Sequence, residues 1–528
     1  MSRSSGGTKR SPRLSVAARL FITVWIVYSI HFASNVVRET YLAIALGEKL
    51  SVRVDEYLGL HPDLFEIPGK GSYINSNPGA SMLGAIPYAI ARPVIAGIFR
   101  AKPELARPKP AATYADPRPN RTTFMNESRR RGLDVKLALA AASMHAGLMV
   151  PLGALGALVM FLFLRARLRD ERKALWLSLL YAFGTPIFFR SAFLNQNAIV
   201  THAVLIAYVL VVGLRPSASS SAEGRDSEEA PKNRQDARII GAGALLGLCV
   251  LCDYSGVALA VAFGVWCIWE GWRRGGKTLA FRWPLLLIAG ALGPLLLLSI
   301  YQWAAFGNPW LPAQAYIPAT EFSVRGWHGF TIPSLSLLSG NLFDPEYGLF
   351  VFCPMLLGAL AAPFIRGRER DGGPAPSELA LIFAGSAALY VFASSVQFAA
   401  MQFNTGVRYM VPAVPLLFIA LVPVLLRLPW RAAAALVVPA VIISWAVAMT
   451  REAVPTALAR IFTSGLELPW LTVLRKMSGA YAPFLAANPS PIPLFILVGL
   501  LLWLLWRKAP LPERVARVRT GAGGSPYT

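Results

Sequence analysis

The sequence predicts an all-α polytopic membrane protein with about twelve transmembrane helices and a long first outer loop that contains interfacial helices. Hydrophobic residues make up 55% of the 528 residues, charged residues only 15%, and the mean hydropathy is +0.50. A soluble domain could not bury that much apolar surface. Apolar stretches recur from Leu20 to Trp506, each long enough to cross roughly 30 Å of hydrocarbon as a helix.

The predicted spans follow from these apolar stretches and form one transmembrane domain over residues 20–506. They cover residues 20–37, 138–164, 174–190, 197–214, 239–253, 255–271, 283–305, 349–365, 378–395, 409–426, 432–449 and 491–506. A soluble domain of independent size is not predicted, because the polar segments between the spans are too short to bury a core of their own.

The distribution of Lys and Arg predicts the orientation. The basic N-terminal tail, residues 1–19, and the C-terminal tail, residues 507–528, are predicted to be cytoplasmic, and so is the polar linker 215–238. The first loop, residues 38–137, and the loops 306–348 and 450–490 then lie outside. These assignments, together with the abundance of Ala and Arg, predict a multi-pass protein of a bacterial inner membrane.

One stretch of the first outer loop, Ala80–Phe99, is apolar enough to cross the membrane, and a crossing there would reverse the side of every later loop. The basic residues of those later loops favour keeping it outside. Pro87 and Pro93 within the stretch argue against a single regular helix and favour short helices along the membrane surface.

Composition also excludes some functions. The net charge of +23 comes from basic residues dispersed among short loops rather than gathered on one polar domain, which argues against nucleic-acid binding. The four cysteines, Cys249, Cys252, Cys267 and Cys353, lie in or beside apolar segments and are interpreted as buried small side chains. No disulfide framework and no cofactor are predicted.

Candidate catalytic residues are the acids of the first outer loop, Glu39, Asp55 and Asp63. A carboxylate that faces a cavity at the membrane surface can take a proton from an acceptor hydroxyl while a phosphate-linked group leaves. Most loop acids are only solvated surface charges, so the sequence does not choose among the three.

The segment KGSYINSNPGASMLGAIPYAIARP within this loop combines turn formers, amides and aromatic residues before an apolar stretch. That composition is typical of a binding loop laid onto a membrane surface. Tyr73, Asn75, Asn77 and Tyr88 are therefore predicted to bind substrate. Arg38 and Lys70 are candidates for holding a phosphate, although basic residues at membrane interfaces commonly just reach toward headgroups.

This segment resembles the first loop of the C-type membrane glycosyltransferases of the protein O-mannosyltransferase and aminoarabinose-transferase kind. Four later segments fall in the matching order: FGTPIFFRSAFLNQNAIVTHAV, GALLGLCVLCDYSG, YQWAAFGNPW with DPEYGLFVFCP, and FNTGVRYMVPAVPLLF. The resemblance covers most of the chain. It implies a GT-C-like fold and the use of a polyprenyl-phosphate sugar.

The resemblance also implies roles for particular residues. An acid of the first outer loop acts as catalytic base, by position Glu39, with Asp55 or Asp63 as rivals. The Gly-x-Arg-Tyr element places Arg408 at the donor phosphate, with Tyr409 beside it, and His202 matches a family histidine. The family often has Asp-Lys where Asn75 and Ser76 stand here, and the second outer loop offers amides but no acid, so no metal site is expected.

The function predicted from these observations is transfer of a sugar from a polyprenyl-phosphate-linked donor to a glycan, lipid or protein acceptor on the outer face. Membrane lipids are the other expected partners. A multi-span transporter or lipid flippase is an alternative that the number of spans would suit, although acids in the middle of the spans are scarce. A non-catalytic protein of envelope assembly is the third reading.

Overall fold

The computed structural model describes a predominantly helical protein with one small β-hairpin. The described residues are 14–109, 113–114, 119–213, 229–367, 369, 372–399, 406–477 and 490–507. Residues 1–13 and 508–528 of the predicted tails, residues 214–228 of the predicted linker and residues 478–489 of the last predicted outer loop lie outside them.

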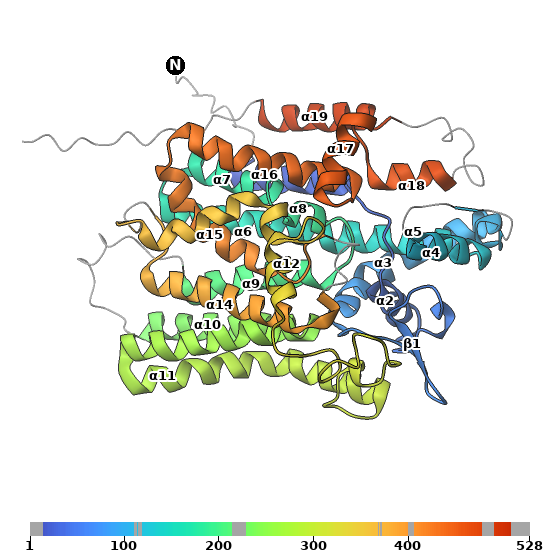
Figure 1. Cartoon of the computed structure of the whole chain (residues 1–528), viewed down its shortest axis with the longest axis horizontal. Coiled ribbons are helices and arrows are strands. Elements are labelled where there is room, and N and C mark those ends of the chain that lie inside the picture. The colour runs from blue at the N-terminus through green and yellow to red at the C-terminus, as the bar shows by residue number, and fades with distance from the viewer. Residues whose placement is uncertain are drawn as a thin grey trace, which may run out of the picture.

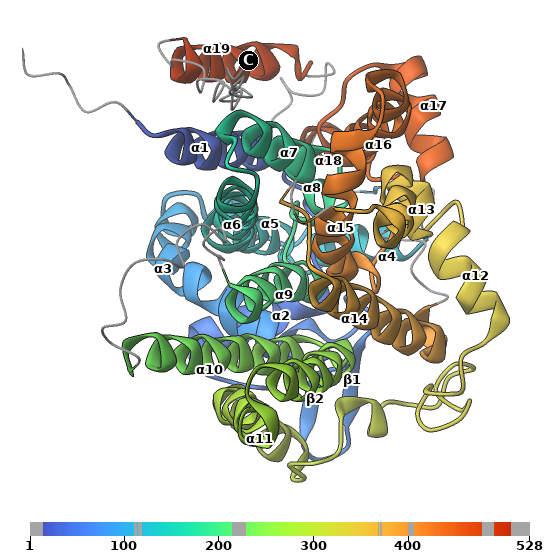
Figure 2. The same cartoon turned by 90° about the vertical axis from the view of Figure 1, so that its left-hand side faces the viewer.

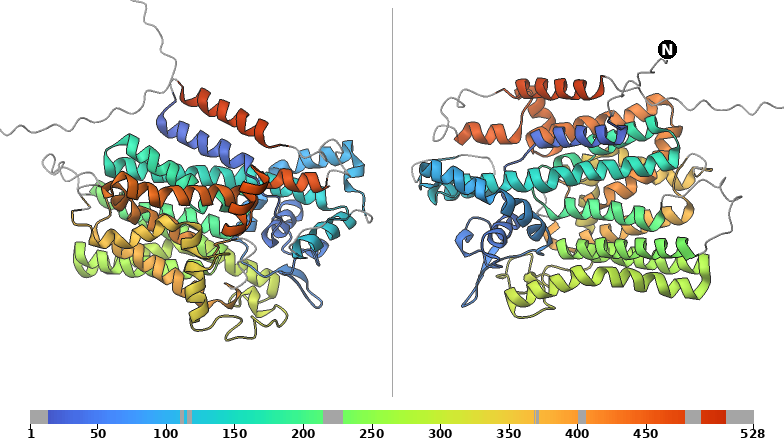
Figure 3. Two further views of the ribbon diagram at one scale, coloured as in Figure 1. Left: turned by 45° about the horizontal axis from the view of Figure 1, so that its top comes forward. Right: turned by 180° about the vertical axis from the view of Figure 1, so that it is seen from behind.

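The long helices run nearly parallel to one another, as Figure 1 shows. Helix α10 (Glu229–Cys252) packs against α11 (Ser255–Phe306) along one side of the bundle and against α9 (Gln196–Val212) toward its centre. On the opposite side, α1 (Val16–Ile30) lies beside α19 (Ile492–Trp506), which the end-on view of Figure 2 and the left panel of Figure 3 also show.

Further helices fill the space between these two sides. They are α6 (Val150–Leu168), α7 (Glu171–Phe183), α8 (Ile187–Arg190), α12 (Leu335–Phe343), α13 (Leu349–Phe352), α14 (Pro376–Ser395), α15 (Val414–Arg427), α16 (Trp430–Thr450), α17 (Val454–Ser464) and α18 (Pro469–Met477). The core between them is largely apolar, with Phe161, Phe189, Phe263 and Phe418 all buried.

Six helices in the described part of the chain are long and apolar enough to cross a membrane. They are Gly79–Ala101, Asp134–Leu168, Asn233–Cys252, Ser255–Phe306, Pro376–Ser395 and Trp430–Thr450, and shorter apolar helices accompany them. The polytopic helical class predicted from the sequence is thus confirmed, while the number twelve stays a prediction.

Helix α11 contains two of the predicted spans, 255–271 and 283–305. The backbone leaves the helical region at Gly275 and Gly276, where φ is −151° and +60°, so the two halves are separated by a break. Gly276 can adopt the positive φ because it has no Cβ. The sequence GWRRGGKT therefore divides one long helical segment into two.

Two other predicted spans are interrupted. Residues 174–190 form α7 and α8, which are separated at Gly184–Pro186, and residues 349–365 form α13 and a 3₁₀ helix, Pro354–Phe364. Proline lacks a backbone N–H, so each break begins where the helical hydrogen-bond ladder loses a donor.

The first predicted outer loop is folded at one end of the bundle, the right-hand end in Figure 1. It contains α2 (Arg38–Lys49), the hairpin of β1 (Leu64–Ile67) and β2 (Gly71–Ile74), α3 (Gly79–Ala101), α4 (Pro119–Arg130) and the start of α5 (Asp134–Met144). The hairpin was not among the expected helical elements. Its strands pair antiparallel, Leu64 opposite Ile74, around a turn in which Gly69 has φ of +76°.

Helix α3 corrects the expectation that prolines would divide this stretch. It is continuous over 23 residues although Pro87 and Pro93 lie inside it. It packs along α2 and α5, and the ring of Pro87 lies where Gly147 has no side chain: a Cβ at Gly147 would come within 2.5 Å of it. Tertiary packing thus outweighs the local cost of the prolines. Whether α3 crosses the membrane stays a matter of prediction.

A buried ion pair ties α6 to α14 at the end of the bundle away from the first loop. Arg167 donates two hydrogen bonds to the Glu378 carboxylate, at 3.0 and 3.1 Å, and the two side chains are 9% and 1% exposed. Glu378 also accepts from the Ala375 backbone N–H at 3.1 Å, where α14 begins. A guanidinium that lost this partner would stay charged in an apolar setting.

We expect Glu378→Gln to lower the free energy of unfolding by about 3–5 kcal/mol, because the substitution leaves Arg167 buried without its counter-charge. Thermal unfolding in detergent, followed by intrinsic fluorescence, measures this. The control is Glu171→Gln in the exposed pair Arg165–Glu171, where the side chains are 46% and 35% exposed and the cost should stay below about 1 kcal/mol. Equal effects of the two substitutions would contradict the prediction.

Candidate active site

A cavity of about 880 Å³ lies where the first-loop elements meet the ends of the helices. Its walls come from segments far apart in the sequence: residues 34–39, 60–63, 75–77, 121–125, 190–196, 253–258, 310–314, 327–330, 392–398 and 408–409. Convergence of polar groups from so many elements on one concave space is typical of a binding or catalytic site.

Arg38 organises the polar corner of this cavity. It is the first residue of α2, and its guanidinium contacts two acids: Nε donates to Glu39 Oε1 at 3.0 Å and Nη1 to Asp63 Oδ2 at 2.5 Å. Glu39 is only 3% exposed at its side chain, whereas Asp63 is 31% exposed. The carboxylates raise the pKa of Arg38 against the opposing effect of burial, so it stays charged.

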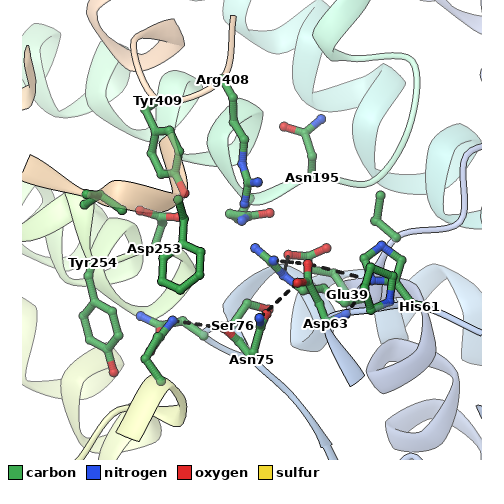
Figure 4. Close-up of a pocket in the computed structure, with 18 of the residues that line it drawn as sticks. Glu39, His61, Asp63, Asn75, Ser76, Asn195, Asp253, Tyr254, Arg408 and Tyr409 are labelled. Atoms are coloured by element: carbon green, nitrogen blue, oxygen red, sulfur yellow. Dashed lines mark hydrogen bonds and ion pairs between the residues drawn. The ribbon is translucent and has the colours of Figure 1, made fainter. Parts of the chain in front are cut away.

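Gln196 joins this corner to Arg408. With the amide oriented so that both of its atoms are satisfied, the nitrogen donates to Glu39 at 2.8 Å, and the oxygen accepts from Arg38 at 3.1 Å and from Arg408 at 3.0 Å. Arg408 also donates to Asn197 Oδ1 at 3.3 Å. Figure 4 shows Arg408 and Tyr409 approaching the cavity from the side opposite Glu39 and Asp63.

Asp63 is held ionised. Burial raises the pKa of its carboxyl, but Arg38, His61 and Arg408 outweigh burial and bring the pKa down to about 2. The Asn75 side-chain amide donates to its second oxygen at 3.0 Å. This arrangement fixes both oxygens of Asp63 while leaving part of the carboxylate open to the cavity.

His61 is a cavity residue that sequence reasoning missed. Its Nδ1 accepts a hydrogen bond from the Asp63 backbone N–H at 3.1 Å, so in this tautomer Nε2 carries the ring proton. Burial, with the positive charges of Arg38 and Arg408, lowers the pKa of His61. The ring is therefore neutral near pH 7. The signal was present in the sequence HPDLF, two residues before Asp63.

Several residues predicted from the sequence do line this cavity. Glu39, Asp63, Arg38 and Arg408 are among its charged groups, which also include Asp253, Arg121 and Arg190, and Asn75, Asn77 and Tyr409 lie in its wall. Asn77 is buried and donates to the Val250 carbonyl at 2.7 Å, which ties the 75–77 loop to the end of α10. Arg408 lies 5.1 Å from the centre of the Tyr409 ring, which helps to orient the guanidinium.

Other predicted residues lie elsewhere. Asp55 pairs with Arg53 at 2.9 Å and accepts from the Ser72 N–H at 2.6 Å, outside the cavity. Lys70 donates to the Phe306 carbonyl at 3.2 Å and accepts at its own carbonyl from Tyr73 at 3.0 Å. Lys70 thus holds the hairpin against the end of α11.

Two further predicted residues are also remote from the cavity lining. The Tyr88 hydroxyl donates to Glu48 at 2.5 Å and joins α3 to α2. His202 is 1% exposed within α9, where it packs against Gly156; a Cβ at Gly156 would lie 2.2 Å from its Nδ1. Their contacts are those of residues that position helices.

The far wall of the cavity is apolar. Val257 and Ala258 of α11, Phe392 of α14, Val396 just after α14, and Trp327 of the segment between α11 and α12 contribute to it. Away from the cavity, α11 and α14 form an apolar furrow between them. There a second hollow of about 290 Å³ is lined by Val261, Ala262, Val265, Trp266, Trp269, Ala380, Leu381, Ala384 and Ala388.

Over the described residues, no group of three or more His, Cys, Asp and Glu side chains is placed to hold a metal ion. The charges that face the acids of the polar corner are guanidinium groups.

Comparisons with known proteins find similar structures but no sequence relative. No family model matches the chain, and no curated protein matches it. The solved structures similar to it include ArnT from Cupriavidus metallidurans bound to undecaprenyl phosphate, with 15% identity and a TM-score of 0.45 over 93% of this chain and 75% of that one.

Two further similar structures come from other organisms. The archaeal oligosaccharyltransferase AglB from Archaeoglobus fulgidus, in complex with an inhibitory peptide and a dolichol-phosphate, has 13% identity and a TM-score of 0.42, over 92% of this chain and 59% of that one. The Saccharomyces cerevisiae protein O-mannosyltransferase Pmt1-Pmt2 complex has 15% identity and a TM-score of 0.32, over 60% and 37%. The kinds of protein to which the sequence motifs point are thus among those that the structural comparison finds.

The Asp63–Arg38 pair should make stability depend on acidity. A carboxyl whose pKa falls from 3.8 to about 2 on folding contributes stability above pH 3.8 that is lost as the pH falls toward 2. We therefore expect the difference in unfolding midpoint between wild type and Asp63→Asn to be constant from pH 7 to 5 and to shrink below pH 4. Thermal unfolding at stepped pH measures it.

Glu66→Gln is the matched control, because Glu66 is an exposed acid of the same hairpin. It should show little difference from wild type at any of these pH values. A difference for Asp63→Asn that stays constant or grows on acidification would mean that the Arg38 pair does not hold Asp63 ionised.

Proposed function

We propose that this protein is a membrane glycosyltransferase that moves a sugar from a polyprenyl-phosphate-linked donor to an acceptor on the outer face of the membrane. One observation carries the proposal: one cavity brings Arg38 and Arg408 together with the carboxylates of Glu39 and Asp63 and has an apolar wall on α11 and α14, the same two helices that line a second, apolar hollow. A donor with a charged phosphate, a polar sugar and a long apolar tail needs those three surroundings together.

The donor phosphate would bind between Arg408 and Arg38. Gln196 holds the two guanidinium groups toward one point, since its oxygen accepts from both. Guanidinium groups suit phosphate oxygens because each presents several N–H donors in a fixed plane. As the sugar leaves, the phosphate gains negative charge, and the same donors stabilise that charge.

The carboxylates supply the acid–base chemistry. In one displacement, the acceptor hydroxyl oxygen forms a bond to the anomeric carbon, its proton passes to Glu39 or Asp63, and the bond from that carbon to the phosphate oxygen breaks. Asp63 is the more accessible of the two carboxylates. The neighbouring arginines bring the pKa of Asp63 down to about 2, which makes it a weak base, so substitution decides between the two residues.

The furrow between α11 and α14 would hold the polyprenyl tail. Val257 and Ala258 at the cavity are followed along α11 by Val261 and Val265 of the furrow, at the helical spacing that keeps them on one face. A tail lying there would be in contact with the bilayer along its length, because α11 exposes Val261 and Val265 strongly, at 59% and 60%.

The orientation follows from charge. The end of the bundle opposite the cavity bears Arg165 and Arg167 in the last turn of α6, Arg169 just after it, Arg273 and Arg274 at the α11 break, Arg427 at the end of α15 and Arg431 at the start of α16. Clusters of this kind favour the cytoplasmic side. The cavity would then face outward from a bacterial plasma membrane, with both termini inside.

The decisive assay is release of polyprenyl phosphate from polyprenyl-phosphate sugars by the purified protein in detergent. Undecaprenyl phosphate and dolichol phosphate, the ligands named for two of the similar structures, are the carriers to test first. Donor turnover that requires an added acceptor supports the proposal. Movement of lipid or solute across sealed vesicles without donor cleavage would instead indicate a transporter or flippase.

Arg408→Ala should lower donor turnover by about 10²-fold or more, because the leaving phosphate loses a preorganised donor. Arg408→Lys should recover only part of the loss, since an ammonium cannot reproduce the planar fork. Arg431→Ala removes an exposed arginine remote from the cavity and should have no effect. Full activity of Arg408→Ala would exclude the assigned phosphate site.

Glu39→Gln and Asp63→Asn, assayed side by side, identify the base. We expect one of them to lose about 10²-fold or more in turnover, because the proton acceptor is gone. Asp55→Asn serves as control, since Asp55 is an acid of the same loop that lies outside the cavity. Retention of full turnover by both Glu39→Gln and Asp63→Asn would disprove the acid–base mechanism.

Filling the furrow should weaken donors with long tails selectively. Ala384→Trp places a bulky ring in the furrow, and we expect it to raise KM about tenfold for a long-chain donor while barely changing KM for a donor with a short tail. Ala387→Trp is the matched control, because Ala387 is an exposed residue of α14 that does not line the furrow. The same increase for short and long tails would exclude the furrow as the tail site.

A further inference from the structure

Asp253 stands apart from the other acids of the cavity. It lies in the turn between α10 and α11 and lines the wall that faces Glu39 and Asp63 (Figure 4). Both of those carboxylates contact Arg38, whereas no Lys, Arg or His nitrogen of the described residues lies within 4.0 Å of the Asp253 carboxylate.

The surroundings of Asp253 are largely non-ionic. Tyr254, Val257 and Tyr409 line the cavity beside it. Its Oδ1 accepts from the Ser255 backbone N–H at 2.9 Å, where α11 begins, and the side chain is partly buried. One oxygen thus caps the helix, and that role alone would be filled equally well by Asn or Ser. Burying part of a negative charge without a nearby cation costs free energy, so the bond to the Ser255 N–H alone does not account for an acid at position 253.

A carboxylate accepts hydrogen bonds and cannot donate them when ionised. A ligand group that meets Asp253 must therefore present donors, such as the hydroxyl groups of a sugar ring. A ligand with a second negative charge at the same place would be repelled, and repulsion of this kind discriminates between otherwise similar ligands. The transferred sugar, attached to a phosphate held at Arg408, would occupy the space between the two walls.

We propose that Asp253 is a specificity residue that accepts hydrogen bonds from hydroxyl groups of the transferred sugar and excludes sugars that carry a carboxylate. This inference rests on the proposed glycosyltransferase function, and it narrows the donor to uncharged, hydroxyl-bearing sugars. The helix-capping oxygen and the selecting charge belong to the same side chain, and substitution can separate them.

The test uses three ligands on one carrier: polyprenyl phosphate without sugar, the carrier linked to a neutral hexose, and the carrier linked to the corresponding uronic acid. Binding to the full-length protein in detergent is measured by microscale thermophoresis, so the readout does not require turnover. Wild type should bind the neutral-sugar donor at least about tenfold more tightly than the uronic-acid donor, a difference of about 1.4 kcal/mol.

Asp253→Asn keeps a capping side chain but removes the charge, and Asp253→Ser keeps the cap and removes the carboxylate. Both should reduce the tenfold preference to about threefold or less while the unfolding midpoint and the affinity for sugar-free polyprenyl phosphate stay close to wild type. Asp344→Asn is the control, since Asp344 makes the same kind of turn, to the Glu346 N–H at 2.7 Å, and does not line the cavity.

Four outcomes would overturn the inference. An unchanged preference in both variants would leave Asp253 only its capping role. An equal gain in affinity for all three ligands would place its effect on the phosphate rather than the sugar. Wild type that binds no carrier at all would refute the proposed function as well, whereas Arg408-dependent binding of the carrier without discrimination between sugars would refute the role of Asp253 alone.

Discussion

The Arg38 guanidinium is the interaction on which the site depends. It begins α2, the helix that follows α1 in the chain, and contacts Glu39 and Asp63, while the Gln196 amide connects it to Arg408. Residues from the first loop, the start of α9 and the segment just before the 3₁₀ helix Val411–Ala413 are thereby held around one point. Because each acid has a cation and each of these cations an acceptor, four charges can be kept in a largely buried space at moderate cost.

The same corner explains why the first loop is folded as it is. The hairpin register places Leu64 opposite Ile74, so Asp63 and Asn75 meet at its open end, where their side chains bond at 3.0 Å. Lys70, at the hairpin turn, is attached to the end of α11 through the Phe306 carbonyl. The hairpin is therefore fixed at both ends, and Asp63 is presented to the cavity by a rigid element rather than by a free loop.

Much of this could be predicted from sequence, because apolar length and charge distribution are local properties. The helical membrane class and the first loop as the location of the acids were accessible in that way, whereas Arg408 as a candidate for holding phosphate came from the family resemblance of the segment FNTGVRYMVPAVPLLF. The choice between Asp55 and Asp63 was not accessible from the sequence. Both precede polar turns in the same loop, and only the hairpin register shows that Asp63 faces the cavity while Asp55 bonds to the Ser72 N–H on another side.

The contributions of Gln196, His61 and Asp253 were hidden for a related reason. Gln196 owes its role to Arg38 and Arg408, which are distant in the chain, and Asp253 to the lack of a cation within 4.0 Å among the described residues. His61 lies two residues from Asp63, but only the folded structure shows that the two face the same cavity. The continuity of α3 was misjudged because proline penalties are local, while its packing on α2 and α5 is tertiary.

The two sides of the cavity differ in how their charges are balanced. On the Arg38 side, acids and arginines compensate one another, so that side is close to neutral and binds through directed hydrogen bonds. On the opposite side, Arg408 and Tyr409 enter the cavity with Asp253, whose carboxylate has no cation within 4.0 Å among the described residues. A phosphate would therefore be drawn to the two guanidinium groups and repelled by Asp253. This asymmetry orients an elongated donor, with its phosphate at the arginines and its tail in the furrow between α11 and α14, before any chemistry begins.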